Sequence, residues 1–335
     1  MRICILGEHS SRLDEGMRNF AFHLAKELSK NHEVASLDSH LNSILSKSFW
    51  GEIKKFDPQI VHYIPGPSPL SFILAKAVAF CSNDAKVIMS AFHPRFHFLL
   101  KRVVPLLKPD LILTQTYETE EMFSNLGCKT RFLPSGVDPE RFTPVSKQVK
   151  NGLRKKYGLD KDKFIVLHVG HITEERGLRI LEKLQGGDNQ VIIIGSTSIR
   201  VDQPVYQALK EKGCFVWRTY FKNVEEIYAL SDCYLFPTIS RKGSPELPLS
   251  VMEAMSCNLP VISTRFGALP RVFDEGDGLF FAERDEDFFR GLRAIKDGTV
   301  IRTREKVTPY SWGNIAGRLE QIYSEMWNEI NKGCL

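Results

Sequence analysis

Two short stretches of the chain combine residue types that can bind an anion. The first is GSPELPLSVMEAMS, residues 243–256, in which Pro248 stands where an apolar helix would begin. Proline is favoured at that position because it has no backbone N–H to leave unpaired. The amides of Leu249, Ser250 and Val251 would then point out of the helix N-terminus, where backbone N–H groups and the helix dipole attract negative charge.

Glu253 lies four residues after Leu249, and therefore one turn into the same predicted helix. A carboxylate at this place can accept hydrogen bonds from the hydroxyls of a ribose or sugar ring. It can equally complement the positive end of the helix dipole without binding a ligand. The spacing alone leaves both interpretations open.

The second stretch is HVGHITEERGL, residues 168–178. Gly170 directly follows an apolar run, and glycine allows a ligand to approach the backbone closely. If His171 and Arg176 face the same ligand, they form a cationic pair for a diphosphate, with Arg176 the stronger donor. A solvated charge at a helix start and an ordinary loop histidine explain the same two residues. His168, like His62, fits an ordinary structural histidine.

The elements that must position these residues are short apolar runs alternating with amphipathic segments. This alternation is typical of parallel sheets with helices on both faces. The pattern begins at residues 2–7 and starts again at 163–170, which predicts two doubly wound halves joined by a linker over 143–162. Ligands of such sheets bind beyond the carboxyl ends of the strands, so we expect the site in the cleft between the halves. The expected strands are 2–7, 32–37, 59–64, 86–92, 111–115, 130–138, 163–170, 190–196, 214–221, 233–238, 259–265 and 278–282.

Composition excludes several other classes. The 335 residues are 43% apolar and 25% charged, which is typical of a soluble globular protein of about two domains. A net charge of +5 is too small to indicate a nucleic-acid partner. No apolar run reaches the length of a membrane-spanning helix, and the start lacks the cleavage site of a signal peptide. The seven cysteines include no CxxC pair, which argues against zinc and disulfides and favours a reducing cytoplasm.

Six segments of the chain resemble glycosyltransferase family 4, the group 1 retaining transferases of the GT-B fold, and they occur in family order. The N-terminal half is matched more loosely, by residues 2–7, Gly16 with its helix, and 59–64. The six segments are SGVDPERFTP (135–144), VGHITEERGL (169–178), VEEIYALSDCYLFPT (224–238), PLSVMEAM (248–255), LPVISTRFGALPRVF (259–273) and SWGNIAGRLEQIY (311–323).

The resemblance implies an α/β fold with GT-B architecture, in which two doubly wound Rossmann-like domains face a central cleft. Residues 1–145 would form the acceptor-binding domain and residues 146–311 the domain that binds a nucleotide-sugar donor. A C-terminal helix over about 312–335 would pack back on the first domain.

The resemblance also assigns roles by position. Glu253 matches the residue that holds the nucleotide ribose, and Leu249 and Ser250 match the positions whose amides hold the distal phosphate. Arg176 matches the basic residue that neutralises the leaving diphosphate. His171 stands where the family usually has arginine, and its charge depends on pH.

Three further residues complete the expected site. Gly16 matches the N-terminal loop that faces donor and acceptor, and His93 resembles a histidine that contacts the donor sugar near the reacting carbon. The family normally separates two glutamates by seven residues, whereas Glu246 and Glu253 are separated by six. Pro245 therefore stands where the first glutamate belongs. Either the loop shifts so that Glu246 reaches the donor sugar, or that contact is missing.

The implied activity is retaining, hexosyltransferase-type transfer from a nucleoside-diphosphate sugar to a sugar, glycolipid or lipid-linked saccharide. No cofactor and no metal are expected, and Asp285 and Asp287 fit acidic residues at a helix start. The alternative is a non-catalytic nucleotide-sugar-binding or scaffold protein. The displaced Glu246 and the substitution of His171 for arginine favour that alternative.

Residues 93–109, HPRFHFLLKRVVPLLKP, interleave basic and apolar side chains. A basic amphipathic helix of this kind can lie on an anionic membrane, which would place the protein in the cytoplasm and on the inner face of the cell membrane. The favoured interpretation is a helix that packs its apolar side on the N-terminal sheet and leaves its Lys and Arg side chains in water.

Overall fold

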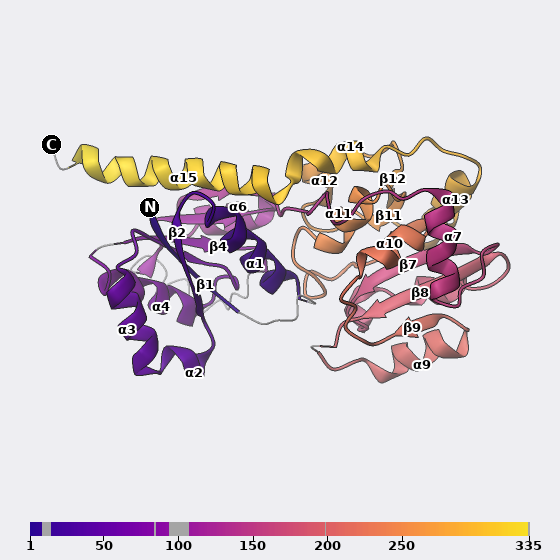
Figure 1. Cartoon of the computed structure of the whole chain (residues 1–335), viewed down its shortest axis with the longest axis horizontal. Coiled ribbons are helices and arrows are strands. Elements are labelled where there is room, and N and C mark those ends of the chain that lie inside the picture. Colours follow the sequence, from indigo (N-terminus) through magenta and orange to yellow (C-terminus); the bar gives the residue numbers. More distant parts are fainter. Residues whose placement is uncertain (9–14, 84, 94–106, 198, 334–335) are drawn as a thin grey trace. The chain divides into compact units, whose positions relative to one another are not determined.

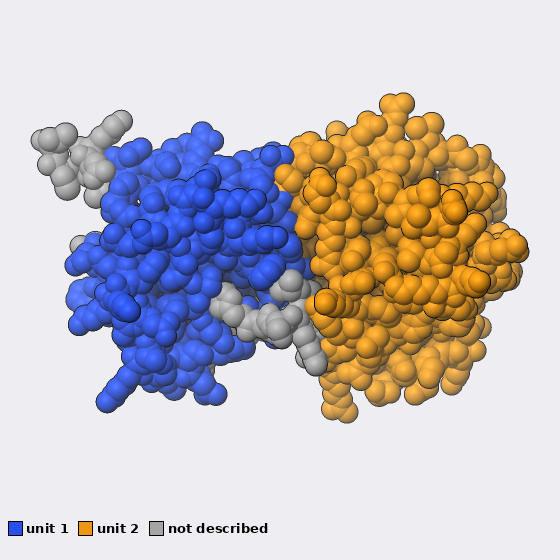
Figure 2. Space-filling view, in the orientation of Figure 1, with its two compact units in different colours: residues 1–135, 312–335 blue, residues 136–311 orange. Residues whose placement is uncertain are grey.

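The chain forms two compact units in the computed structural model, which describes residues 1–8, 15–83, 85–93, 107–197 and 199–333 (Figures 1 and 2). Unit 1 consists of Met1–Ser135 and Trp312–Leu335, and unit 2 of Gly136–Ser311.

The division after Ser135 falls ten residues before the boundary expected at 145. The intervening residues are held by unit 2: the Val137 amide donates to the Tyr310 carbonyl at 2.9 Å, and the Ser256 hydroxyl donates to the Phe142 carbonyl at 2.7 Å.

The sheet of unit 1 has six parallel strands in the order β2-β1-β3-β4-β5-β6. The chain reverses its direction of travel across the sheet between β1 and β3, which are hydrogen-bonded neighbours. The strands are β1 (Arg2–Gly7), β2 (Glu33–Asp38), β3 (Ile60–Tyr63), β4 (Lys86–Ser90), β5 (Leu111–Thr114) and β6 (Thr130–Phe132), and the helices include α1 (Gly16–Leu28), α2 (Leu41–Ile44), α3 (Lys47–Phe56), α4 (Pro69–Phe80), α6 (Tyr117–Ser124) and α15 (Trp312–Gly333).

Helix α15 packs on unit 1 although it is the last element of the chain (Figure 1). Its Tyr323 hydroxyl is 2.6 Å from Nδ1 of His62 on β3, and Nε2 of the same histidine is 2.8 Å from the Ser90 hydroxyl on β4. Trp312 packs edge-on against Phe20 of α1, with the ring centroids 5.4 Å apart. A polar cluster and an aromatic contact thus fix the helix to the sheet and to α1.

The sheet of unit 2 also has six parallel strands, in the order β12-β11-β10-β7-β8-β9. Here the winding direction reverses between β7 and β10. The strands are β7 (Phe164–Gly170), β8 (Asn189–Gly195), β9 (Phe215–Trp217), β10 (Cys233–Phe236), β11 (Val261–Thr264) and β12 (Leu279–Ala282). The helices include α7 (Lys147–Lys156), the 3-10 turn η2 (Glu174–Arg176), α8 (Arg179–Leu184), α9 (Gln203–Glu211), α10 (Glu225–Leu230), α11 (Leu249–Ser256), α12 (Leu269–Val272), α13 (Asp285–Lys296), α14 (Thr303–Val307) and the 3-10 turn η3 (Thr308–Tyr310).

The predicted linker over 143–162 is wrong, because it contains helix α7, which packs on α10. Ser146 caps the helix by accepting the Val149 amide at 3.3 Å. Arg154 is buried and donates to the Leu230 carbonyl at 3.0 Å and to Asp232 at 2.5 Å. The basic composition of this segment therefore does not indicate a linker, because the guanidinium of Arg154 is buried where α7 packs on the rest of unit 2.

The predicted α/β class with two doubly wound Rossmann-like units is confirmed by the two parallel sheets and their helices. In the described part of the chain, no helix is both long enough and apolar enough to span a bilayer.

Candidate functional site

The reversal point between β7 and β10 organises the predicted site residues of unit 2. Strand β7 ends at Gly170 and β10 ends at Phe236, and the two strands pair in parallel, with Val166 opposite Cys233. The connections that follow them wind away in opposite directions. In open parallel sheets this leaves a crevice at the carboxyl ends, where ligands bind.

Arg176 is buried beside this reversal point, at the end of the η2 turn. Its guanidinium carbon lies 5.7 Å from the centre of the Phe236 ring, within the range of a cation–π contact. Gly170 makes room for the guanidinium, because a Cβ atom at Gly170 would stand 2.7 Å from Arg176 Nη1. Gly177, with φ of 66°, lies against the Pro237 carbonyl in the same way and fixes the turn to the end of β10.

His168 lies next to this arginine and is fully buried. Its Nδ1 donates to the Leu235 carbonyl at 2.9 Å, so Nε2 carries the lone pair of a neutral imidazole. Burial, with smaller contributions from the charges of Arg176 and His171, lowers the pKa of His168 to about 3, although the hydrogen bond to the Leu235 carbonyl acts to raise it. His171 and Arg176 therefore both lie near His168, and the expectation that they face one ligand stays a prediction. His168 itself stays neutral and adds no positive charge.

The N-terminus of α11 contributes backbone donors. Pro248 occupies the N-cap with extended φ and ψ, one residue before the first helical position at Leu249. The Leu249 and Ser250 amides precede the first intrahelical bond. The expectation that the Val251 amide is a third available donor is wrong, because it donates to the Pro248 carbonyl at 3.2 Å. The tight first turn thus leaves two amides at the helix end.

Tyr234 joins this helix end to the arginine. Its hydroxyl donates to the Val169 carbonyl at 3.3 Å, and the Ser250 side chain hydrogen-bonds to it. Burial raises the pKa of Tyr234, whereas Ser250 and the charge of Arg176 act to lower it. The tyrosine ring stacks on His168, with the centroids 6.4 Å apart. Arg176, His168 and the start of α11 therefore belong to one contiguous group.

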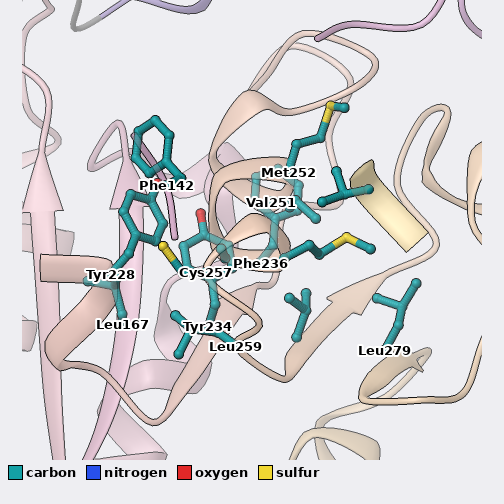
Figure 3. Packing of buried hydrophobic residues seen from close by; sticks show 14 of the residues in the cluster. Phe142, Leu167, Tyr228, Tyr234, Phe236, Val251, Met252, Cys257, Leu259 and Leu279 are labelled. Carbon is teal, nitrogen blue, oxygen red and sulfur yellow. The ribbon is translucent and has the colours of Figure 1, made fainter. Parts of the chain in front are cut away.

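Glu253 is held one turn into α11 by a buried tyrosine. The Tyr228 hydroxyl donates to Glu253 Oε2 at 2.7 Å. Burial raises the pKa of Glu253, while the Tyr228 hydrogen bond and the charge of Arg141 act to lower it. Figure 3 shows Tyr228 among the core residues that pack around α11, with Phe142 edge-on at 5.5 Å. One carboxylate oxygen is thus fixed by a protein donor, which orients the other.

Glu246 lies on the loop between β10 and α11 and is 6% exposed. Its carbonyl accepts the Ala268 amide at 2.8 Å. Gly267, with φ of 54°, lies so close to this carbonyl that a Cβ atom there would collide with it. The turn after β11 therefore fixes the backbone of Glu246, and the buried side chain starts from a fixed Cα position.

The two remaining predicted residues belong to unit 1. Gly16 is the first residue of α1, which follows β1 at the reversal point of that sheet. His93 follows β4, and its carbonyl oxygen lies 2.9 Å from where a Cβ atom of Gly66 would stand. Both residues thus lie beyond the carboxyl ends of strands of unit 1, and the group around Arg176 lies at the corresponding edge of unit 2.

Comparison with known proteins identifies the part of the chain that carries this group. Residues 149–311 match the family model of the glycosyl transferases group 1. This segment is therefore similar to the group 1 glycosyltransferases. The matched segment contains Arg176, His171, Glu246, Glu253 and the start of α11.

Individual relatives agree with this assignment. Sulfoquinovosyl transferase SQD2 of Arabidopsis thaliana is 25% identical over 321 residues, which are 86% of this chain and 61% of that protein. A GDP-mannose-dependent monoacylated alpha-(1-6)-phosphatidylinositol monomannoside mannosyltransferase of Corynebacterium glutamicum is 28% identical over 187 residues, 51% of this chain and 48% of that protein. The chain thus spans only about half to three fifths of the length of these relatives.

The fold has a similar counterpart among solved structures. The crystal structure of HepE from Anabaena in complex with UDP superposes with a TM-score of 0.77 and covers 97% of this chain and 100% of that one. At 13% identity this similarity shows a common fold.

The matched segment also contains functional candidates that the sequence motifs do not indicate. Tyr228 and Tyr234 lie in the 224–238 segment that carries part of the resemblance, but their residue types and spacing predict no role for either. His168 was interpreted as an ordinary structural histidine, but it stacks on Tyr234 and lies close to Arg176. The available signal was a tyrosine or histidine inside an apolar strand or helix run, and it is weak without the fold.

Several expectations concern ions, membranes and the segment 93–109. Among the described residues, no group of three or more His, Cys, Asp and Glu side chains is placed to hold a metal ion, and the expected independence of metals and cofactors stays a prediction. Asp285 and Asp287 do begin helix α13, and Asp287 accepts the Glu283 and Arg284 amides at 3.0 Å.

Residues 94–106 lie outside the described residues, so the membrane contact stays a prediction.

Proposed function

We propose that the protein is a retaining glycosyltransferase that moves a sugar from a nucleoside-diphosphate sugar to an acceptor hydroxyl. The observation that carries the proposal is the group at the reversal point of unit 2, where Arg176 and the start of α11 approach the same tyrosine. A buried guanidinium and two helix-end amides suit a diphosphate better than any neutral ligand. The group 1 family match over 149–311 supports the same activity.

In the proposed reaction the bond between the sugar C1 and the leaving phosphate oxygen breaks. The acceptor oxygen bonds to the same carbon on the same face, and its proton passes to the leaving phosphate. Arg176 and the amides of Leu249 and Ser250 would stabilise the negative charge that develops on the diphosphate. Because these donors are already held by Gly170, Phe236 and the helix, little reorganisation is required when the bond breaks.

Glu253 would hold the donor ribose. Its Oε2 already accepts the Tyr228 hydroxyl, so Oε1 remains oriented toward ribose hydroxyls. His171 would assist Arg176 when protonated, and Glu246 would contact the donor sugar from its loop. His93 and Gly16 of unit 1 would face the donor sugar and the acceptor.

We infer a carbohydrate or lipid-linked acceptor. The support is indirect: the Corynebacterium relative is named as a mannosyltransferase of a phosphatidylinositol monomannoside. UDP in the HepE complex similarly supports a nucleoside-diphosphate donor.

The decisive experiment measures donor binding and release of the nucleoside diphosphate. UDP, GDP, ADP and their common sugar conjugates are tested for thermal stabilisation, since ligand at about 100 times Kd stabilises by roughly 2.7 kcal/mol. Each donor that binds is then incubated with sugar and lipid-phosphate acceptors, and the anomeric configuration of the product is determined by NMR. We expect one nucleotide to stabilise the protein and the product to retain configuration.

Arg176→Ala should lower kcat by about 10²–10³-fold, as loss of a preorganised charge-stabilising donor does. Arg179→Ala is the matched control, because Arg179 lies three residues away, is exposed and pairs with Glu174 at 3.1 Å on the surface. Unchanged diphosphate release by Arg176→Ala, or an equal loss with Arg179→Ala, would contradict the proposed role of Arg176.

A nucleotide-sugar-binding protein without transferase activity is the second candidate. It is favoured by the six-residue spacing of Glu246 and Glu253, together with the Ala268 hydrogen bond that holds the Glu246 backbone. This candidate predicts donor stabilisation with no diphosphate release across the acceptor panel.

A further inference from the structure

Unit 1 contains a pocket of about 470 Å³ at the edge of its sheet where the strands begin. Lys86 starts β4, Leu111 starts β5 and Lys129 immediately precedes β6, and all three line this edge pocket. The carboxyl ends of the same strands, including the one that leads to His93, are at the opposite edge of the sheet. The edge pocket is therefore a separate feature from the predicted acceptor-facing residues of unit 1.

The lining of the edge pocket is strongly basic. Its two carboxylates are already engaged: Asp110 is 3.3 Å from Lys86 Nζ and also accepts the Val87 amide at 2.8 Å, and Glu325 is 2.6 Å from Arg131. Cations outnumber carboxylates by five to two, which leaves a local excess of positive charge. The cationic residues are Lys76, Lys86, Lys108, Lys129 and Arg131.

The interior side of the edge pocket is apolar. Leu111 of β5 and Ile322 of α15 are buried there, and Met326 lines it one turn further along the helix. A volume of about 470 Å³ lies within the range of small-molecule sites. A concave apolar surface with a basic lining suits a ligand that carries both an anionic group and an organic group.

Helix dipoles alone do not account for this lining. Helices α4 and α6 end near the beginnings of the strands that follow them, and cations are favoured at helix C-termini. That effect explains single lysines near each helix end. It does not explain why cations from α4, from the start of β4 and from the 127–131 segment surround one concave volume together with Lys108.

We propose that the edge pocket binds a phosphate-bearing ligand, at a site separate from the nucleotide-sugar site. The ligand is a phosphate ester, whose anionic group lies among the lysines and whose organic part lies on Leu111, Ile322 and Met326. Two sources supply this chemistry: the headgroup of an anionic phospholipid and a free phosphorylated metabolite. The site goes beyond the proposed transferase activity and does not depend on it.

The test removes two cations of the edge pocket in the full chain. The Lys76→Gln, Lys108→Gln double variant is compared with Lys54→Gln, Lys55→Gln, which removes the same charge from exposed positions of α3 in the same unit. Sedimentation with vesicles of phosphatidic acid in phosphatidylcholine measures lipid binding. Calorimetric titration with glycerol 3-phosphate measures binding of a soluble phosphate ester.

We expect one of the two probes to bind the parent and the α3 variant equally. The edge-pocket variant should bind it roughly twenty-five-fold more weakly, since each basic residue near an anionic surface contributes about a factor of five. Vesicle binding that glycerol 3-phosphate does not displace assigns the lipid source, and calorimetric binding without vesicle binding assigns the soluble source. Equal weakening in both variants, or no binding of either probe by the parent, overturns the proposal. Donor-dependent stabilisation should be the same in all three proteins.

Discussion

Acidification from pH 7 to pH 5 is expected to destabilise both units, because each encloses a fully buried neutral histidine. His62 lies between Tyr323 and Ser90 in unit 1, and His168 lies under Arg176 in unit 2. Burial lowers the pKa of each imidazole from 6.5 to about 3. At pH 5 both therefore stay neutral while the protein is folded, whereas in the unfolded chain both are mostly protonated.

The sign follows from the depressed folded-state pKa values. The stability that these histidines contribute is fully present above about pH 6.5 and is lost progressively as the pH falls toward 3. Between pH 7 and pH 5 each histidine should cost about 2 kcal/mol of unfolding free energy, and the pair about 4 kcal/mol. Glu253 acts in the opposite direction, because burial raises its pKa and the folded state binds its proton more readily.

Urea denaturation at pH 7 and pH 5 measures the effect in the parent, in His62→Gln, in His168→Gln and in the double variant. Glutamine keeps hydrogen-bonding capacity but does not titrate, so each single variant should lose about half of the pH dependence. His40→Gln, at an exposed position of unit 1, is the control and should behave as the parent. If the double variant lost as much stability between pH 7 and pH 5 as the parent, the buried histidines would not be the cause.

Three further outcomes test the packing of unit 2. Gly170→Ala should weaken nucleotide binding about tenfold or more, measured by titration, because the new Cβ atom would stand only 2.7 Å from Arg176 Nη1 and would force the guanidinium to move. Unchanged binding would refute the importance of this guanidinium position. Tyr228→Phe should cost about 1 kcal/mol of donor affinity by calorimetry, since Glu253 loses its orienting donor; equal affinity would show that Glu253 needs no such support. Arg154→Ala should lower the unfolding free energy by about 3 kcal/mol in urea, because it leaves carbonyls and a carboxylate without their buried donor; a loss below the error of the assay would mark α7 as dispensable to the core.

The positions of most strands along the chain were predictable because parallel strands are covered on both faces. Such strands read as nearly continuous apolar runs, and the run expected at 190–196 corresponds to β8, Asn189–Gly195. The same signal fails where an apolar segment leaves the sheet: the run expected at 214–221 contains only the three residues of β9, Phe215–Trp217. Tyrosines and tryptophans in a loop look like strand residues when only the sequence is considered.

Helices without a continuous apolar stripe were harder to predict. Helix α3 buries only Phe49 and Ile53, two positions one turn apart within a basic segment. Helix α7 buries Arg154, a residue that periodicity analysis counts as solvent-exposed. Both are amphipathic, but the residues that carry the packing are too few or of the wrong type to indicate a helix without tertiary context.

The candidate site divides in the same way. Positions such as Arg176 and Glu253 could be proposed from short motifs, because the motif fixes residue type and spacing along one segment. Their partners could not, because Phe236 and Tyr228 lie 60 and 25 residues away along the chain and reach the site only through the pairing of β7 with β10 and the packing of α10 on α11.

This pairing also explains why a buried cation can serve in the proposed site. Strands β7 and β10 are hydrogen-bonded neighbours, so the turn after one strand and the helix after the other meet at a single edge. The turn supplies Arg176, and the helix supplies the Leu249 and Ser250 amides. His168 is kept neutral mainly by burial. The nearby Arg176 acts in the same direction, because a protonated imidazole would repel the guanidinium. The positive charge of Arg176 itself is therefore retained at any pH at which the protein is folded, because a guanidinium stays protonated.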